Sequence, residues 1–63
     1  MTIEKGDLFF WKDTHYQEGI FIITGSKKID GNEAPCSTYR LIENGDDDWH
    51  FDSFITNNAE KIG

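Results

Sequence analysis

Three side chains in this sequence could bind a soft metal ion or form a nucleophilic pair, namely His15, Cys36 and His50. Zinc sites take three or four ligands at characteristic short spacings, and these residues match none of them. Cys36 with His50 could supply a thiol nucleophile and its base. A domain of 63 residues, however, is not expected to contain the deep pocket that shelters such chemistry. We therefore expect no metal, no cofactor and no enzymatic activity.

A second group of candidate side chains is acidic. Glu43, Asp46, Asp47, Asp48 and Asp52 place five carboxylates around one predicted hairpin. Their spacing differs from that of EF-hand calcium loops, in which oxygen ligands alternate and end in a distant Glu. Two interpretations stay open. The acidic residues either solubilise a hairpin tip and keep a sheet edge from pairing with other chains, or form an epitope whose carboxylates replace phosphates in a basic groove.

The net charge of −6 is unevenly distributed along the chain. Residues 1–28 hold four acidic and four basic side chains, so the whole excess lies in residues 29–63. An acidic surface repels nucleic acid and anionic lipid. We therefore expect a protein partner with a basic surface and no membrane association, and direct binding to nucleic acid is disfavoured.

Aromatic side chains supply the core and a further candidate site. The chain has nine aromatic rings, more than one face of a small sheet can hide. Trp11 and Tyr16, in or beside the predicted loop 13–18, are the expected surface contacts, because Trp and Tyr anchor interfaces disproportionately. The same rings with a nearby carboxylate could instead form a cage for a methylated cation.

Length and composition predict a single domain over residues 1–63. Cys36 is the sole cysteine, so no internal disulfide forms. The N-terminal residues lack the pattern of a signal peptide. The longest apolar run, Ile20–Ile23, is far shorter than the roughly 20 residues of a membrane span. We expect a cytoplasmic protein.

The elements that would position these residues are short strands. Strand-forming residues occupy the segments 8–12, 20–24, 37–43, 48–51 and 59–62. The unbroken apolar segment 20–23 predicts a central strand covered on both faces. Gly25 predicts a bulge or bend after it, and the segment 28–35, which holds an Asp-Gly pair and a proline, predicts a loop or a distal hairpin.

The C-terminal third is expected to contain a hairpin and a short turn. Asn44-Gly45 predicts a two-residue turn with both residues at positive φ. Trp49 alternates with His50, and Trp49 is expected to be largely buried. Residues 52–56 predict a capped single helical turn. No segment has helical periodicity beyond two turns, which indicates an all-β chain.

This order of elements resembles the SH3-like barrel, and more narrowly the small SH3-like proteins of bacteria and their phages. Those proteins open with Gly-Asp before a hydrophobic strand, here Gly6–Lys12, and continue with a glycine-led strand, here Gly19–Ile23. They close with a Tyr-Arg-Leu strand, a turn and an aromatic-plus-acid strand, here Tyr39–Leu41, Asn44–Asp46 and Trp49–Asp52. The resemblance covers nearly the whole chain.

The resemblance implies an all-β fold, a small five-stranded SH3-like barrel with one single-turn helix before the last strand. The Ala-Leu-Tyr-Asp-Tyr segment of proline-binding SH3 domains does not occur here, so binding to proline-rich peptides is not implied. We expect an acidic protein-interaction module, and by resemblance a phage-encoded inhibitor of a host or defence protein that acts in the host cytoplasm. Two alternatives stay open: a KOW- or Tudor-like module that binds nucleic acid or a modified peptide, and a structural accessory protein that forms homo-oligomers through a barrel edge.

Overall fold

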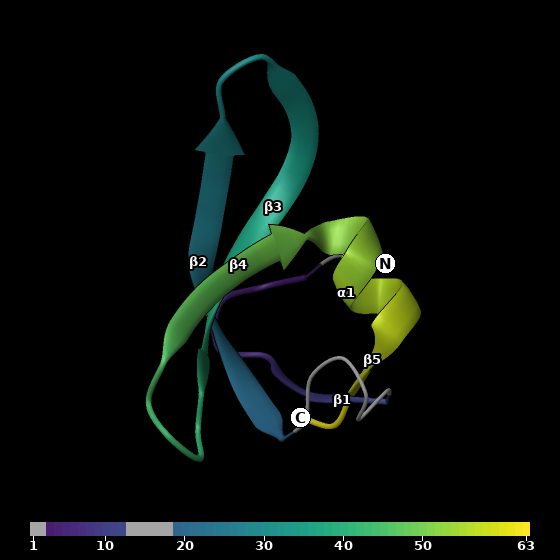
Figure 1. Ribbon diagram of the computed structural model, residues 1–63. Helices are drawn as coiled ribbons and strands as arrows, with labels where there is room; N and C mark the ends of the chain where they lie inside the picture. Colours follow the sequence, from purple (N-terminus) through teal and green to yellow (C-terminus); the bar gives the residue numbers. More distant parts are fainter. Residues whose placement is uncertain (1–2, 13–18) are drawn as a thin grey trace.

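The computed structural model describes residues 3–12 and 19–63 and contains five antiparallel strands in one open sheet, with a short helix before the last strand (Figure 1). The elements are β1 (Leu8–Trp11), β2 (Ile20–Ile29), β3 (Asn32–Leu41), β4 (Asp47–Phe51), α1 (Asp52–Asn58) and β5 (Ala59–Lys61). The sheet order is β4-β3-β2-β1-β5, so the first and last strands are neighbours. The mostly β fold and its five strands were predicted correctly.

The hairpin formed by β2 and β3 is longer than predicted and projects beyond the other strands (Figure 1). Its last strand pair is Ile29 with Asn32, which leaves Asp30 and Gly31 as the turn. Gly31 has a φ of 80°, a conformation that glycine adopts without steric cost. Of the two alternatives for residues 28–35, the distal hairpin is therefore correct.

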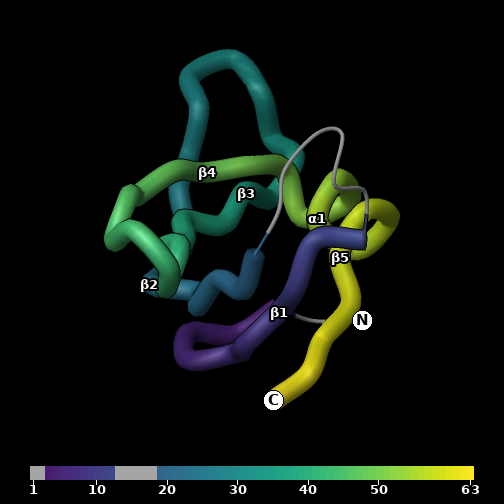
Figure 2. The backbone as a smooth tube through the Cα atoms, turned by 60° about the horizontal axis from the view of Figure 1, so that its bottom comes forward, coloured from purple at the N-terminus to yellow at the C-terminus, as the bar shows by residue number. Residues whose placement is uncertain are grey.

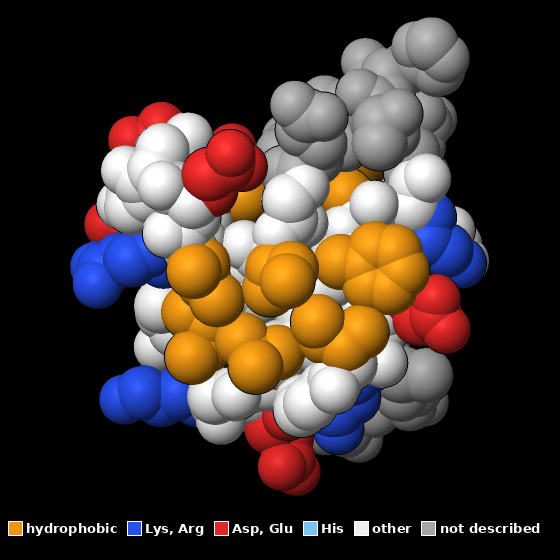
Figure 3. Space-filling view, turned by 90° about the horizontal axis from the view of Figure 1, so that it is seen from below, with side chains coloured by type: hydrophobic (Ala, Val, Ile, Leu, Met, Phe, Trp, Pro, Cys, Tyr) orange, Lys and Arg blue, Asp and Glu red, His pale blue; other side chains and the backbone are white. Residues whose placement is uncertain are grey.

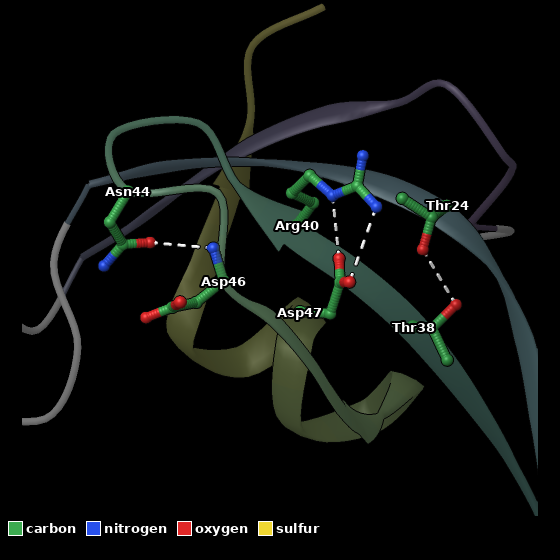
Figure 4. Close-up of polar contacts among 6 residues, drawn as sticks. All are labelled: Thr24, Thr38, Arg40, Asn44, Asp46 and Asp47. Carbon is green, nitrogen blue, oxygen red and sulfur yellow. Dashed lines mark hydrogen bonds and ion pairs between the residues drawn. The ribbon is translucent and has the colours of Figure 1, made fainter.

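A β-bulge interrupts β2 next to Gly25, as predicted. Ile23 pairs with Tyr39 but Gly25 pairs with Thr38, so one residue of β2 is extra at this point. The extra residue is Thr24, whose Oγ1 lies 2.9 Å from Oγ1 of Thr38 in a hydrogen bond across the two strands (Figure 4). The bulge bends β2 between the part that pairs with β1 and the part that pairs with β3 alone.

The connection between β3 and β4 differs from the predicted two-residue turn. It spans residues 42–46, and the backbone N–H of Gly45 donates to the carbonyl of Leu41 at 2.8 Å. Gly45 has a φ of 75°, whereas Asn44, like every non-glycine residue described, has a negative φ. The prediction is wrong because Asn44 stabilises the turn differently: its Oδ1 accepts a hydrogen bond from the N–H of Asp46 at 3.0 Å (Figure 4).

Core residues come from both the sheet and α1, and Figure 2 shows the arrangement of these elements from a second direction. Its buried members are Phe9, Trp11, Phe21, Ile23, Tyr39, Ile55 and Ala59. The Trp11 ring stacks on Phe21 with centroids 4.6 Å apart and meets Tyr39 edge-on at 5.8 Å. Such aromatic pairs add about 0.5–1.5 kcal/mol each beyond the area they bury.

The helix α1 is longer than the predicted single turn. It covers seven residues, and its Ile55 is fully buried. Ala59, four residues further at the start of β5, is buried as well, so the same side of this segment packs on the core. Burial of this side explains why the chain stays helical to Asn58 although Asp52–Asn58 contains few strong helix formers.

Strand β4 faces the core with His50 rather than with Trp49. The His50 ring stacks on Phe54 with centroids 4.3 Å apart and meets Trp11 edge-on at 5.9 Å. Trp49 is half-buried and lies outside the core cluster, with Nζ of Lys27 at 5.4 Å from its ring centroid. The partial exposure of Trp49 agrees with the prediction that it is largely buried. Its ring, however, lies on the opposite face of β4 from His50, because neighbouring residues of a strand point to opposite faces.

Candidate functional site

Most of the predicted acidic epitope lies on the β3–β4 hairpin. Glu43, Asp46, Asp47 and Asp48 are all exposed there. Arg40 pairs with Asp47 across the strands, and its Nε and Nη2 donate to the two carboxylate oxygens at 2.8 and 3.4 Å (Figure 4). These hydrogen bonds, aided by the opposite charge, hold the pKa of Asp47 below its ordinary value and raise the pKa of Arg40.

The remaining carboxylates of this hairpin, those of Glu43, Asp46 and Asp48, take part in no ion pair with the other described residues. The backbone beneath them is fixed, since the carbonyl of Asp46 accepts from the N–H of Leu41 at 2.8 Å. One oxygen of Asp48 accepts from the N–H of Trp49 at 2.8 Å. The hairpin therefore presents like charges from an ordered loop.

The fifth predicted residue, Asp52, lies apart from the others. It is the first residue of α1 and follows the opposite end of β4. Its Oδ1 accepts a hydrogen bond of 2.6 Å from the Ser37 hydroxyl, and Ser37 is only 3% exposed. Asp52 thus joins α1 to β3, and the structure does not bring it together with the carboxylates of the hairpin.

The aromatic candidates also change place. Trp11, expected as a surface contact, is 3% exposed and belongs to the core, so its ring cannot anchor a partner. Tyr16 lies outside the described residues. A half-buried pair, Trp49 and Phe51, lies on β4 instead, with ring centroids 5.7 Å apart.

The possible nucleophile and base do not meet. Cys36 pairs with Phe51, and His50 pairs with Ser37, so these consecutive positions direct Cys36 and His50 to opposite faces of the sheet. Cys36 is buried, with its Sγ 3.5 Å from the carbonyl oxygen of Ala34. His15 lies outside the described residues, and within residues 3–12 and 19–63 no group of three or more His, Cys, Asp or Glu side chains could hold a metal ion.

A groove of about 750 Å³ lies between the projecting hairpin, the N-terminal segment and the start of α1. Its polar base includes Ser37 and Asp52, and Ile3 contributes apolar surface. Three lysine and three acidic side chains line it, namely Lys5, Lys27, Lys28, Asp30, Glu33 and Asp52. Because the two signs balance, the groove favours neither an anion nor a cation.

Sequence reasoning missed an apolar face on the outer side of the sheet, which Figure 3 shows as a cluster of hydrophobic side chains with charged groups around it. We define the outer face by six residues: Leu8, Phe10, Ile20, Ile22, Ile42 and Ile62. The segment 20–23 was expected to be covered on both faces, but only Phe21 and Ile23 are buried, and Ile20 is 42% exposed. The unbroken apolar runs in β1 and β2 were the available signal.

Comparisons of the chain with protein-family models, with curated proteins and with solved structures return no match. The part of the chain that the structure describes contains no helix long and apolar enough to cross a membrane. The functional proposal is therefore based on the surfaces of this chain itself.

Proposed function

We propose that this protein is an acidic protein-interaction module that binds a basic surface of a partner protein and catalyses no reaction. The observation that carries the proposal is the set of carboxylates on the β3–β4 hairpin that form no ion pair with another described residue, those of Glu43, Asp46 and Asp48. They are exposed and share one sign, and the loop that bears them is held by hydrogen bonds. Such a preorganised charge group speeds the encounter with an oppositely charged surface.

The class of partner follows from the charge of the whole chain. Carboxylates spaced along a hairpin resemble the spaced negative charges of a nucleic-acid backbone. The net charge of −6 disfavours contact with nucleic acid itself and suits a protein that normally binds phosphates. Together with the resemblance to small phage proteins, this supports a phage-encoded inhibitor that occupies a basic groove of a host or defence protein in the host cytoplasm.

The fold that we propose for this module is a small SH3-like barrel. Three features support it: the sheet order β4-β3-β2-β1-β5, the bend in the long β2, and the helix directly before β5. In this arrangement the hairpins lie at the rim of a rigid scaffold, where binding residues are commonly carried.

The test is the association rate with a partner that is captured from native cells and identified by mass. The double variant Asp46→Asn/Asp48→Asn should associate about tenfold more slowly at low salt, and its rate should depend less on ionic strength. The matched control is Asp30→Asn/Glu33→Gln, which removes two charges from the other hairpin and should leave the rate close to that of the parent. Equal rates for the parent and the Asp46/Asp48 variant would refute the acidic epitope.

One observation favours a second candidate, a Tudor-like module for a modified peptide. The Lys27 ammonium lies over Trp49, and Phe51 meets the same indole edge-on. A cation at an aromatic pair is the contact used to recognise methylated lysine. Titration with a trimethyl-lysine peptide should then quench the fluorescence of the parent but not of Trp49→Phe, and an unchanged parent spectrum excludes this candidate.

A further inference from the structure

The outer face is ordered in two rows that cross four strands. In the first row, Glu60 of β5 is opposite Phe10 of β1, which is opposite Ile20 of β2. Ile42, directly after β3, continues the row because its N–H donates to the carbonyl of Ile20 at 2.9 Å. The first row is therefore apolar except for an acid at its β5 end.

The second row carries its charged residue at the other end, and the sign of that charge is positive. Ile62 donates its N–H to the carbonyl of Leu8, Leu8 is opposite Ile22, and Ile22 is opposite Arg40 of β3. This row is apolar except for a base at its β3 end. The face therefore carries one acid and one base at diagonally opposite corners, with the six apolar side chains between them.

We propose that a second copy of this chain docks on the outer face and forms a symmetric dimer. In a two-fold interface the same patch meets itself, so the patch must be complementary to its own rotated image. The two-fold axis lies in the plane of the interface, between β1 and β2, and is perpendicular to the line from Glu60 to Arg40. Rotation about this axis brings each Glu60 to Arg40 of the other copy. The apolar rows then cover one another.

Exposure and hydrogen bonding are consistent with this contact. Ile20, Ile42 and Ile62 are 42%, 57% and 49% exposed and are the most exposed large apolar side chains described. Contiguous exposed apolar surface with a polar rim is typical of interfaces. Arg40 uses Nε and Nη2 for Asp47, so its Nη1 remains to donate to a carboxylate of the second copy.

The first test is the mass of the protein in solution between about 10 µM and about 1 mM, the range of modest interfaces. Light scattering should show a rise from 7.3 kDa towards twice that value. Ile20→Glu and Ile42→Glu should each weaken dimerisation at least about tenfold, because each places a charge against apolar side chains of the second copy. Both side chains lie outside the core, and circular dichroism should confirm that both variants stay folded.

The second test exchanges the corner charges in an Asp47→Asn background, which removes the internal partner of Arg40. Glu60→Arg and Arg40→Glu should each weaken the dimer, and the two together should restore it, since the exchange re-forms both cross-subunit pairs. Asp47→Asn alone should leave dimerisation at the parent level. The surface variant Lys28→Gln, remote from the two rows, serves as a further control.

A constant mass of 7.3 kDa up to about 1 mM would overturn the proposal. So would a dimer that tolerates both Ile20→Glu and Ile42→Glu, because it would use another surface, such as a sheet edge. Failure of the charge exchange to restore the dimer would overturn the two-fold arrangement. The variant Asp46→Asn/Asp48→Asn should dimerise like the parent, so this test is independent of the proposed acidic epitope.

Discussion

The hydroxyl of Ser37 donates a hydrogen bond of 2.6 Å to Oδ1 of Asp52 and thereby joins the middle of β3 to the first residue of α1. Ser37 is the one buried polar residue in the part of the chain that the structure describes. A short bond to a carboxylate is stronger than one between neutral groups. This contact therefore fixes where the helix starts and how it is placed over the core.

Ser37→Ala should destabilise the protein by about 1–3 kcal/mol, because the Asp52 carboxylate loses its buried donor. The free energy of unfolding can be measured by urea denaturation, with Ser26→Ala as the control. Ser26 is exposed on β2 and pairs with Ser37. It therefore lies next to Ser37 but takes no part in the hydrogen bond to Asp52. Equal stability of Ser37→Ala and the parent would show that the bond does not contribute.

Gly45→Val should cost about 1–2 kcal/mol, because its φ of 75° is unfavourable for residues with a Cβ. The strain is purely in the backbone, since an added Cβ would meet no atom within 4 Å. Asn44→Ala should cost less, about 0.5–1 kcal/mol, as only its bond to Asp46 is lost. Thermal melting of both variants checks this order, and a larger loss for Asn44→Ala would favour the two-residue turn.

The pKa of Asp47 should rise towards its ordinary value in Arg40→Gln, because the hydrogen bonds and the positive charge of Arg40 lower it in the parent. A carboxyl whose pKa is depressed by folding stabilises the folded state above its unfolded pKa. That contribution disappears as the pH falls through the folded pKa. Carbon-detected NMR titration of Asp47 in both proteins measures the shift, and identical curves would contradict the pairing.

His50→Ala should destabilise the protein by about 1–2 kcal/mol, because it removes the ring that stacks on Phe54 and contacts Trp11. His50→Phe should keep the stability near that of the parent, as it preserves the stack. The matched comparison on the same strand is Trp49→Ala, which should cost less because Trp49 lies outside the core. The reverse order in denaturant titrations would mean that β4 faces the core with Trp49.

The sequence predicted those elements whose signal is local. Strand-forming residues located all five strands, and Gly25 marked the bulge. Strand ends were less predictable: β2 continues to Ile29 because it pairs with β3 rather than because of its own composition. Asn44-Gly45 misled because the same dipeptide also fits a longer turn in which glycine alone has positive φ.

The candidate site was predictable only in part, because charge can be counted in a sequence but proximity cannot. The acidic hairpin followed from composition, yet the pairing of Asp47 with Arg40 and of Asp52 with Ser37 depends on strand register. Trp11 was assigned to the surface because its type is common at interfaces, but its position on β1 directs it inward. The outer face requires four aligned strands, which no single segment reveals.

The contrast between the two tryptophans makes this protein its own optical probe. Trp11 is shielded from water and stacked on Phe21, so its emission should be blue-shifted and should report the loss of core packing. Trp49 is half-buried beside Lys27 and should emit at longer wavelength. A single Trp49→Phe substitution would therefore yield a chain whose fluorescence follows unfolding alone, while the difference spectrum from the parent follows events on the surface of β4.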